Sequence, residues 1–315
     1  MSALAQVYER KQAVWFRRVV IATDFSAASE RALAHALPLI RRYGSAVSIV
    51  HAIPAETVTF EAMPQEFDRQ HAQAEQEMER LTSEAHVKEM FAHVVVETGS
   101  VWEVLSSIIQ REDADLLVMG TRGRTGVKKL MLGSVAEEVL RRATCPVLTI
   151  GPSVAPVAPG KVAFKTILFA TDFGPASPKA FACALALAED CDAKLILLHM
   201  VPPMPGVNVG PGIYGPGFYL AQDLAEWQSK IRKDSARRLM ELVPPDAKLK
   251  HAPEYVVGLD FLPEGILGTA TAHDADLIVM GANRTGSALV AAHTPWSLTH
   301  DVICKAKCPV LTILG

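Results

Sequence analysis

The chain contains an internal repeat, and this repeat limits the folds available to it more than any other feature. The sequence ATDF occupies 22–25 and returns at 170–173, and the blocks around it return in the same order. The repeated blocks are 19–37 with 167–185, 48–54 with 196–202, 114–120 with 275–281, and 144–150 with 307–313. Ordered repetition indicates a duplicated domain, and a chain of 315 residues suits two domains of about 150 residues each.

The segment between the two copies differs from both in composition. Residues 151–165 read GPSVAPVAPGKVAFK, which is rich in proline, alanine and glycine, as linkers are. We therefore expect a first domain over 1–150, a linker over 151–165 and a second domain over 166–315.

Within the first copy, short apolar runs alternate with longer helical patterns. Runs such as VVIA, LLVM and VLTI show no polar alternation, which predicts strands buried on both faces, as in a parallel sheet. Strands are expected at 17–23, 46–52, 93–98, 115–119 and 146–150, and helices at 27–43, 65–90, 100–112 and 134–143. Ser26 is expected to cap the first helix and Gly44 to end it. The alternation predicts an α/β fold of two tandem doubly wound parallel-sheet domains.

Composition and charge exclude several classes of protein. The net charge of −3 leaves no basic excess to neutralise phosphates, so no nucleic-acid partner is expected. No run of about 18 uncharged apolar residues occurs, so no membrane partner is expected, and the N-terminus lacks the apolar core of a signal peptide. Five cysteines without a CxxC pair indicate reduced thiols, and we expect a cytoplasmic protein.

The candidate site follows from the strand ends, because sheets of this kind bind ligands beyond the carboxyl ends of their strands. Asp24 follows the first strand, and GTRGRTGVKKLMLGS at 120–134 follows the fourth. Backbone N–H groups of a glycine-rich loop and of the following helix form an anion site. Ser134 can cap that helix and offer its hydroxyl to a phosphate. Positive charge is added by Arg122, Arg124, Lys128 and Lys129. The pattern predicts a mononucleotide site, with the acid at the sugar and the amides at the phosphates.

These residues resemble a known family. The spacing Gly120-x2-Gly123-x9-Gly133-Ser134, with Asp24 after the first strand and CPVLTI in the last, is similar to the universal stress protein family over nearly the whole chain. The resemblance implies a five-stranded sheet in the order 3-2-1-4-5, like that of adenine-nucleotide α-hydrolases, and domain pairing through the last strands. It also implies bound ATP, with AMP or ADP as alternatives, and Mg²⁺ at the phosphates.

The family's binding residues carry over to matching positions of this sequence. The resemblance places adenine and ribose at Ala22, Thr23, Asp24 and the backbone of Ala52, with Met119 and Gly120 bordering the nucleotide. It places the phosphates at Arg122, Gly123, Gly133, Ser134 and the amides of Val135 and Ala136. Ala52 departs from the valine that is common in the family, but a main-chain contact survives that change.

Several of the candidates also have a purely structural interpretation. Asp24 can cap a helix or close a turn, and the glycines can shape a connection. His51 and His199 stand at equivalent strand ends, where packing or a hydrogen bond is favoured over metal ligation. Cys145 and Cys308 occupy equivalent positions beside proline, as buried small hydrophobic residues do.

The motif content favours a binding protein over an enzyme. No GxxxxGK[ST] loop and no GxSxG turn occur. GPGIYG at 210–215 lies about ten residues beyond its strand among prolines, so it is not a dinucleotide signature. We expect an ATP-binding stress-response regulator with at most slow hydrolysis, able to form a homodimer or larger homo-oligomer. The alternatives are an adenine-nucleotide hydrolase-type enzyme, which would need an SGGxDS-type loop, and a dimerisation module with incidental nucleotide.

The second copy departs from the first in the loop after its fourth strand. This loop reads GANRTGSALVAAHTPWS at 281–297, and Asn283 replaces the glycine of the first copy at 123. Two alignments are open for the Gly133-Ser134 pair: counting from RTG gives His293-Thr294, and counting back from the last cysteine gives Trp296-Ser297.

Either alignment replaces the glycine with a ring residue, and Pro295 has no N–H to offer an anion. Asp172 still stands at the ribose position. We therefore expect the second copy to have lost its phosphate site and to support pairing of the halves.

Overall fold

The computed structural model describes residues 16–54, 64–84, 92–121, 132–157, 164–201, 221–282 and 295–315. The elements of the first half are β1 (Arg18–Ala22), α2 (Ala27–Tyr43), β2 (Ala46–Ile53), α3 (Pro64–Glu84), β3 (Ala92–Thr98), α4 (Val101–Arg111), β4 (Leu116–Gly120), α5 (Ser134–Arg142) and β5 (Val147–Ile150). Those of the second half are β6 (Thr166–Ala170), α6 (Ser177–Cys191), β7 (Lys194–Val201), α7 (Ala221–Leu242), β8 (Glu254–Leu259), α8 (Glu264–Ala272), β9 (Leu277–Ala282), α9 (Pro295–Lys305) and β10 (Val310–Leu314).

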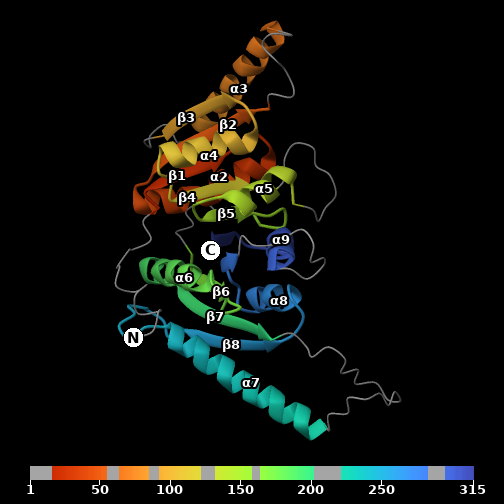
Figure 1. Ribbon diagram of the computed structural model, residues 1–315. Coiled ribbons are helices and arrows are strands. Elements are labelled where there is room, and N and C mark those ends of the chain that lie inside the picture. The colour runs from red at the N-terminus through yellow and green to blue at the C-terminus, as the bar shows by residue number, and fades with distance from the viewer. Residues whose placement is uncertain are drawn as a thin grey trace, which may run out of the picture.

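The described strands join into a single sheet that passes through both halves. Its order is β3-β2-β1-β4-β5-β10-β9-β6-β7-β8, so each half has the order 3-2-1-4-5 of its own strands. All pairs are parallel except β5 with β10, which run antiparallel with Leu148 opposite Leu311. The hydroxyl of Thr149 donates to the carbonyl oxygen of Val310 at 3.0 Å across this junction. The pairing through last strands therefore occurs inside one chain, with the two halves at opposite ends of the sheet (Figure 1).

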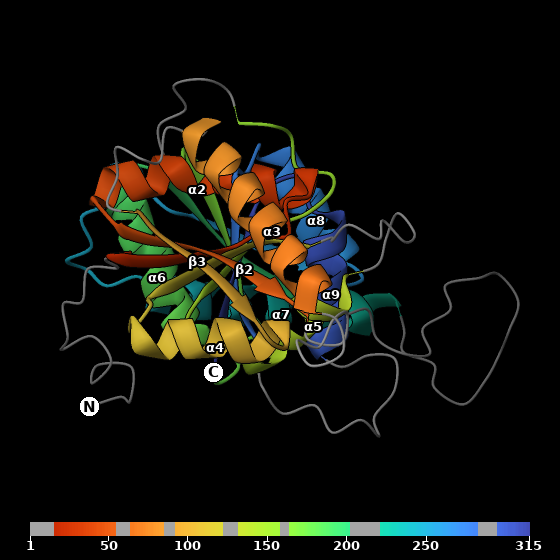
Figure 2. The ribbon, with the colours of Figure 1, turned by 90° about the horizontal axis from the view of Figure 1, so that it is seen from above.

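Successive residues of each strand are buried on opposite faces, as the uninterrupted apolar runs predict. In β1, Val19 and Ile21 pack into a cluster with residues of α2, α3, α6 and α7, whereas Val20 packs into a cluster with residues of α4, α5, α8 and α9. Both clusters extend across the two halves. Figure 2 shows the helices covering both faces of the twisted sheet, which is the three-layer arrangement of a doubly wound fold.

Most predicted boundaries lie within one residue of the observed ones, with one clear exception. The capping of α2 is as predicted: the hydroxyl of Ser26 accepts from the Ser29 amide at 3.3 Å, and Gly44 ends the helix at φ +60°. The helix expected over 65–90 ends at Glu84 in its described part, and 85–91 lie outside the described residues.

The described part of the predicted linker packs against the body of the protein. Val154 and Phe164 are buried in the cluster that covers the α2 and α6 face. His35 of α2 lies with Nε2 3.0 Å from the carbonyl oxygen of Ala155. Apolar side chains and a hydrogen bond thus hold both ends of this connection to the sheet.

Candidate functional site

The strand-end motif ATDF forms a turn held by its own side chains. The hydroxyl of Thr23 accepts from the amide of Phe25 at 3.1 Å, and the carbonyl of Thr23 accepts from His51 Nδ1 at 2.8 Å. Phe25 adopts φ +60° and packs its ring 4.3 Å from that of His51. A left-handed phenylalanine costs on the order of 1–3 kcal/mol, so the surrounding contacts must hold it there.

The second half builds the same turn. Thr171 accepts from the amide of Phe173 at 2.9 Å and from His199 Nδ1 at 2.8 Å, and Phe173 has φ +58°. Both histidines are therefore hydrogen-bonded as predicted, and the described residues contain no metal-binding cluster of His, Cys, Asp and Glu. Because the turn occurs in both halves, it explains the repeated sequence without requiring a ligand.

The predicted ribose acid has a structural role in each half. One carboxylate oxygen of Asp24 accepts from the amide of Ser26 at 3.1 Å. Its counterpart Asp172 accepts from the amide of Gly174 at 2.7 Å and from the hydroxyl of Ser177 at 3.2 Å. The turn-closing interpretation of Asp24 is thus correct, and it leaves the carboxylate at the edge of the sheet where a sugar is expected.

Two glycines of the predicted site differ in what the protein itself requires. A Cβ at Gly120 would lie 2.8 Å from the carbonyl carbon of Ala28, because the first turn of α2 crosses the end of β4. Gly281 is confined in the same way by Ala176, at 2.9 Å. A Cβ at Gly133 would instead meet the Thr121 carbonyl oxygen at an ordinary 3.5 Å. Its φ of −67° and ψ of 149° suit any residue, so no described neighbour requires glycine there.

Gly133 is also the N-cap of α5, which corrects the prediction that Ser134 caps this helix. Ser134 is instead the first helical residue, and no side chain caps the helix. The amide of Gly133 donates to the carbonyl oxygen of Thr121 at 3.0 Å, whereas its own carbonyl accepts from Glu137 at 2.9 Å. The next three N–H groups, those of Ser134, Val135 and Ala136, precede the first intrahelical donor. None of the three has an acceptor within the described part of the chain.

The remaining predicted residues lie along the same edge of the sheet or outside the described residues. Ala22 ends β1, Ala52 lies near the end of β2, and Met119 is buried in β4 beside Gly120. Ser134 and Val135 are exposed, and the side chain of Ala136 is buried. Outside the described residues lie Arg122, Gly123, Arg124, Gly126, Lys128, Lys129 and 210–215.

The structure decides between the two alignments of the second loop. Helices α5 and α9 share one burial pattern at a spacing of 163 residues, and each ends three residues before the equivalent cysteine. The matched buried residues are Ala136 with Thr299, Val139 with Val302, Leu140 with Ile303, and Ala143 with Ala306. This register equates Gly133-Ser134 with Trp296-Ser297, and Leu132 with Pro295. Because α9 begins at Pro295, the position of the glycine N-cap lies inside a helix in the second half.

The second half also differs from the first at the end of its second strand, a difference that sequence reasoning missed. Met200 occupies the position of Ala52, next to Gly258 in β8 and Gly265 in α8. A Cβ at Gly258 would lie 2.4 Å from the Met200 sulfur, and one at Gly265 would lie 2.1 Å from its methyl carbon. The repeat places Glu97 and Val104 at these two glycine positions in the first half. Met200, which is larger than Ala52, therefore fits only because glycine occupies both neighbouring positions.

The cavity at the strand ends of the second half is small. It measures about 60 Å³ at the carboxyl ends of β6, β7 and β9, and its walls include Thr171, Met200, Met280 and Thr299. Small-molecule sites typically measure about 300 Å³ or more. The strand-end cavity of the second half is thus smaller than a nucleotide site in its described residues. A separate hollow of about 560 Å³ in this half lies away from Thr171 and Met200, lined by residues of α8 and of the segment after α9.

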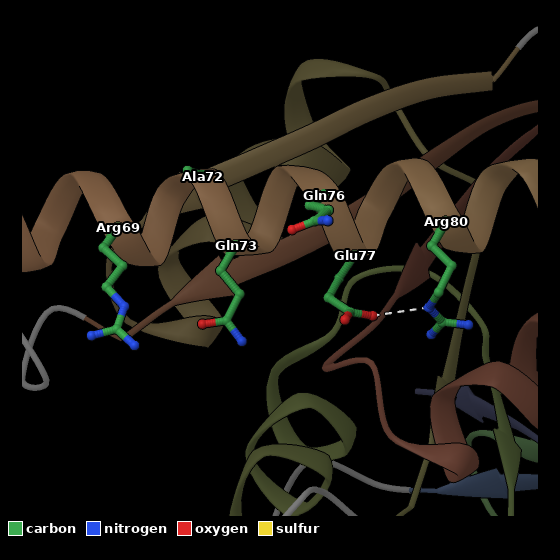
Figure 3. A pocket seen from close by; sticks show the side chains of 6 residues that line it. All are labelled: Arg69, Ala72, Gln73, Gln76, Glu77 and Arg80. Atoms are coloured by element: carbon green, nitrogen blue, oxygen red, sulfur yellow. Dashed lines mark hydrogen bonds and ion pairs between the residues drawn. The ribbon is translucent and has the colours of Figure 1, made fainter.

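A larger hollow, of about 650 Å³, lies along α3. All six lining residues belong to that helix, and Figure 3 shows Arg69, Gln73, Glu77 and Arg80 pointing to one side of it. Arg80 is paired with Glu77 at 3.0 Å and with Glu30 of α2 at 2.7 Å. Because one helix supplies the whole lining and ion pairs occupy part of it, this surface is a weaker candidate than the strand ends.

The buried cysteines behave as predicted. All five are free thiols, and Cys145 and Cys308 are buried. Burial raises the pKa of the Cys145 thiol to about 12, so this thiol stays protonated and is a poor nucleophile. None of the helices in the described part of the chain combines the length and the apolar character that crossing a bilayer requires.

Two doubly wound domains joined through their last strands into one sheet define a tandem α/β protein. The model of the universal stress protein family matches residues 16–151 and 163–313. The chain therefore belongs to the universal stress protein family.

Known proteins resemble this chain over one half or over both. The universal stress protein MJ0531 of Methanocaldococcus jannaschii is 29% identical over 143 residues, covering 43% of this chain and 82% of that protein. The universal stress protein Rv2005c of Mycobacterium tuberculosis is 25% identical over 306 residues, covering 93% of this chain and 95% of that protein. A solved universal stress protein from Archaeoglobus fulgidus matches 95% of this chain and 98% of its own at 19% identity and a TM-score of 0.64. The last match supports the tandem fold.

Proposed function

We propose that this protein is a cytoplasmic, ATP-binding regulator of the stress response, with its nucleotide in the N-terminal half. The observation that carries the proposal is the start of α5. Three successive N–H groups there have no acceptor in the described residues, and they follow Gly133, a glycine that its described neighbours do not require. A glycine at this place lets an anion approach the backbone closely.

The residues present fit a nucleotide in a defined orientation. The N–H groups of Ser134, Val135 and Ala136 receive the phosphates, and Asp24 accepts from the ribose hydroxyls. The backbone of Ala52 meets the base. ATP, ADP and AMP share this adenosine end, and Mg²⁺ bound with the phosphates would supply further neutralisation of their charge. Glu137, the acidic residue in the first turn, is paired with Arg141 at 2.8 Å, which reduces its repulsion of an anion.

A binding role is favoured over rapid catalysis. The turn after β1 is the same in both halves and holds a left-handed phenylalanine, which gives no support to the SGGxDS-type loop of the hydrolase alternative. We infer that ATP is held with at most slow hydrolysis and that the bound nucleotide changes the protein's interactions. The last strands β5 and β10 pair with each other within the chain, so a homodimer or larger homo-oligomer would use other surfaces.

The proposal is tested by denaturing the purified protein and separating the released nucleotide by chromatography, with ATP-dependent thermal shift as a second readout. We expect adenine nucleotide from the wild type, and a Gly133→Val variant that folds but binds ATP at least about a hundredfold more weakly. Gly268→Val is the matched control, because a Cβ at this exposed glycine of α8 meets nothing within 4 Å. No nucleotide and no thermal shift in the wild type would refute the proposal, and rapid multiple turnover would favour the hydrolase.

A further inference from the structure

A residue of the second half contacts the backbone beside the proposed phosphate site of the first. The amide of Leu132, one residue before Gly133, donates to Nε2 of His300 in α9 at 3.4 Å. Figures 1 and 2 both draw α9 next to α5, at the junction of the halves. Leu132 is buried, and His300 keeps 28% of its side chain exposed.

The neighbours of His300 determine which ring nitrogen carries the proton. Oδ1 of Asp301 lies 3.2 Å from Nδ1, and a carboxylate can only accept. The Leu132 amide can only donate, so both contacts are satisfied together when the ring carries its proton on Nδ1 and accepts at Nε2. Lys305 lies 3.4 Å from the other oxygen of Asp301 and 3.5 Å from Glu264 of α8, which positions Asp301 in turn.

The repeat contains no reciprocal of this contact. At the spacing of 163 residues that relates α5 to α9, His300 corresponds to Glu137 and Leu132 corresponds to Pro295. Proline has no N–H to donate, and Glu137 pairs with Arg141 on its own helix. The second half therefore holds the backbone before α5 in the first half, and the first half makes no equivalent contact to the start of α9 in the described residues.

We propose that His300 is a positioning residue for the nucleotide site of the first half, an inference that rests on the proposed function. By accepting the Leu132 amide, it fixes the backbone that enters α5 and so aims the N–H groups of Ser134, Val135 and Ala136. The second half thus contributes to binding in the first without touching the nucleotide.

The test compares two variants whose side chains differ in hydrogen bonding. Glutamine keeps an acceptor near the position of Nε2, whereas leucine fills space without one. Isothermal titration with ATP is expected to show His300→Leu about fivefold weaker than wild type, the effect of one ordinary hydrogen bond, and His300→Gln within about twofold. Equal affinity in all three proteins would overturn the proposal. Equal weakening by both substitutions would also overturn it, because the effect would then belong to packing of the ring.

Amide hydrogen exchange separates this proposal from the proposed function. Exchange at Leu132 and through the first turn of α5 is expected to be faster in His300→Leu than in His300→Gln, with or without nucleotide. A wild type that binds no ATP refutes the proposed function, and the exchange comparison then decides the role of His300 alone. Identical exchange in the two variants would contradict that role.

Discussion

Helices α5 and α9 follow equivalent strands of equivalent domains, yet they begin differently. In the first half a glycine N-cap precedes three N–H groups that have no acceptor in the described residues. In the second half the helix starts two residues earlier in the shared register, with a proline, and the glycine position is Trp296. The difference teaches that two equivalent helices can keep the same buried face while their first turns differ in the N–H groups that they leave without an acceptor in the described residues.

The turn after the first strand shows the opposite behaviour, because it is almost unchanged between the halves. Thr23 and Thr171 make the same hydrogen bonds to a left-handed phenylalanine and a histidine. The repeated ATDF sequence thus marks a structural turn, and we propose that the sequence after the fourth strand determines which half binds a ligand. Substitutions in the two halves test this division, the largest expected effect on the free energy of unfolding being at Met200.

Met200→Ala is expected to lower the free energy of unfolding by about 2 to 4 kcal/mol, because it removes a side chain that fills the space beside Gly258 and Gly265. ATP binding by the first half should be unchanged. Urea unfolding measures the effect, and Met240→Ala is the control, since that methionine is 53% exposed and should cost less than about 0.5 kcal/mol. If Met200→Ala cost as little as Met240→Ala, the Met200 side chain would not be filling this space with stabilising packing.

Gly120→Ala and Gly281→Ala are expected to destabilise the protein by similar amounts, about 1 to 3 kcal/mol each. The added methyl would lie under 3.0 Å from Ala28 in the first turn of α2, or from Ala176, the N-cap of α6. Gly268→Ala, at an exposed helical site with nothing within 4 Å, should instead be neutral or stabilising. A large loss at Gly120 and none at Gly281 would contradict the view that this glycine serves packing in both halves.

Tyr43→Phe is expected to cost about 1 to 2 kcal/mol, because the Tyr43 hydroxyl donates to Asp190 of the other half at 3.0 Å. Burial, and then the nearby Asp190 carboxylate, raises the pKa of Tyr43. Ionisation is therefore easier in the unfolded chain, so this contribution is present below about pH 10 and is lost as the pH rises above it. Urea unfolding at neutral and alkaline pH should show a smaller alkaline loss in Tyr43→Phe. An equal alkaline loss of the free energy of unfolding in wild type and Tyr43→Phe would argue against this link between the halves.

The smallest predicted effect is the change that His199→Asn makes to the acid dependence of the free energy of unfolding. Burial lowers the pKa of His199. Above about pH 6.5 both states are neutral, and below it the unfolded chain takes up the proton first, so the folded state loses stability as the pH falls. Asparagine keeps a donor for Thr171 but does not titrate. Between about pH 7 and pH 5, the change in the free energy of unfolding should differ between wild type and variant by less than about 1 kcal/mol, because the ring is partly solvated. A wild type that gained more stability than His199→Asn on acidification would contradict the predicted loss.

Local signals in the sequence predicted the parts of the fold that depend on local chemistry. Ser26 and Gly44 act as caps through their own side chain or backbone, and the strand runs are buried on both faces as their composition indicates. The predicted N-cap of α5 was wrong. By propensity a serine caps a helix better than the glycine beside it, but the backbone places Gly133 at the N-cap. The coupling of Met200 with Gly258 and Gly265 needs three elements brought together in space, and no local pattern announces it.

The central claim is that one half of the chain binds nucleotide and the other half supports it, and the number of ATP molecules bound per chain tests this most directly. A structure determined with ATP, together with isothermal titration, is expected to show one ATP per chain, at the start of α5 in the N-terminal half. Two ATP molecules per chain, or ATP at the start of α9, would contradict the account.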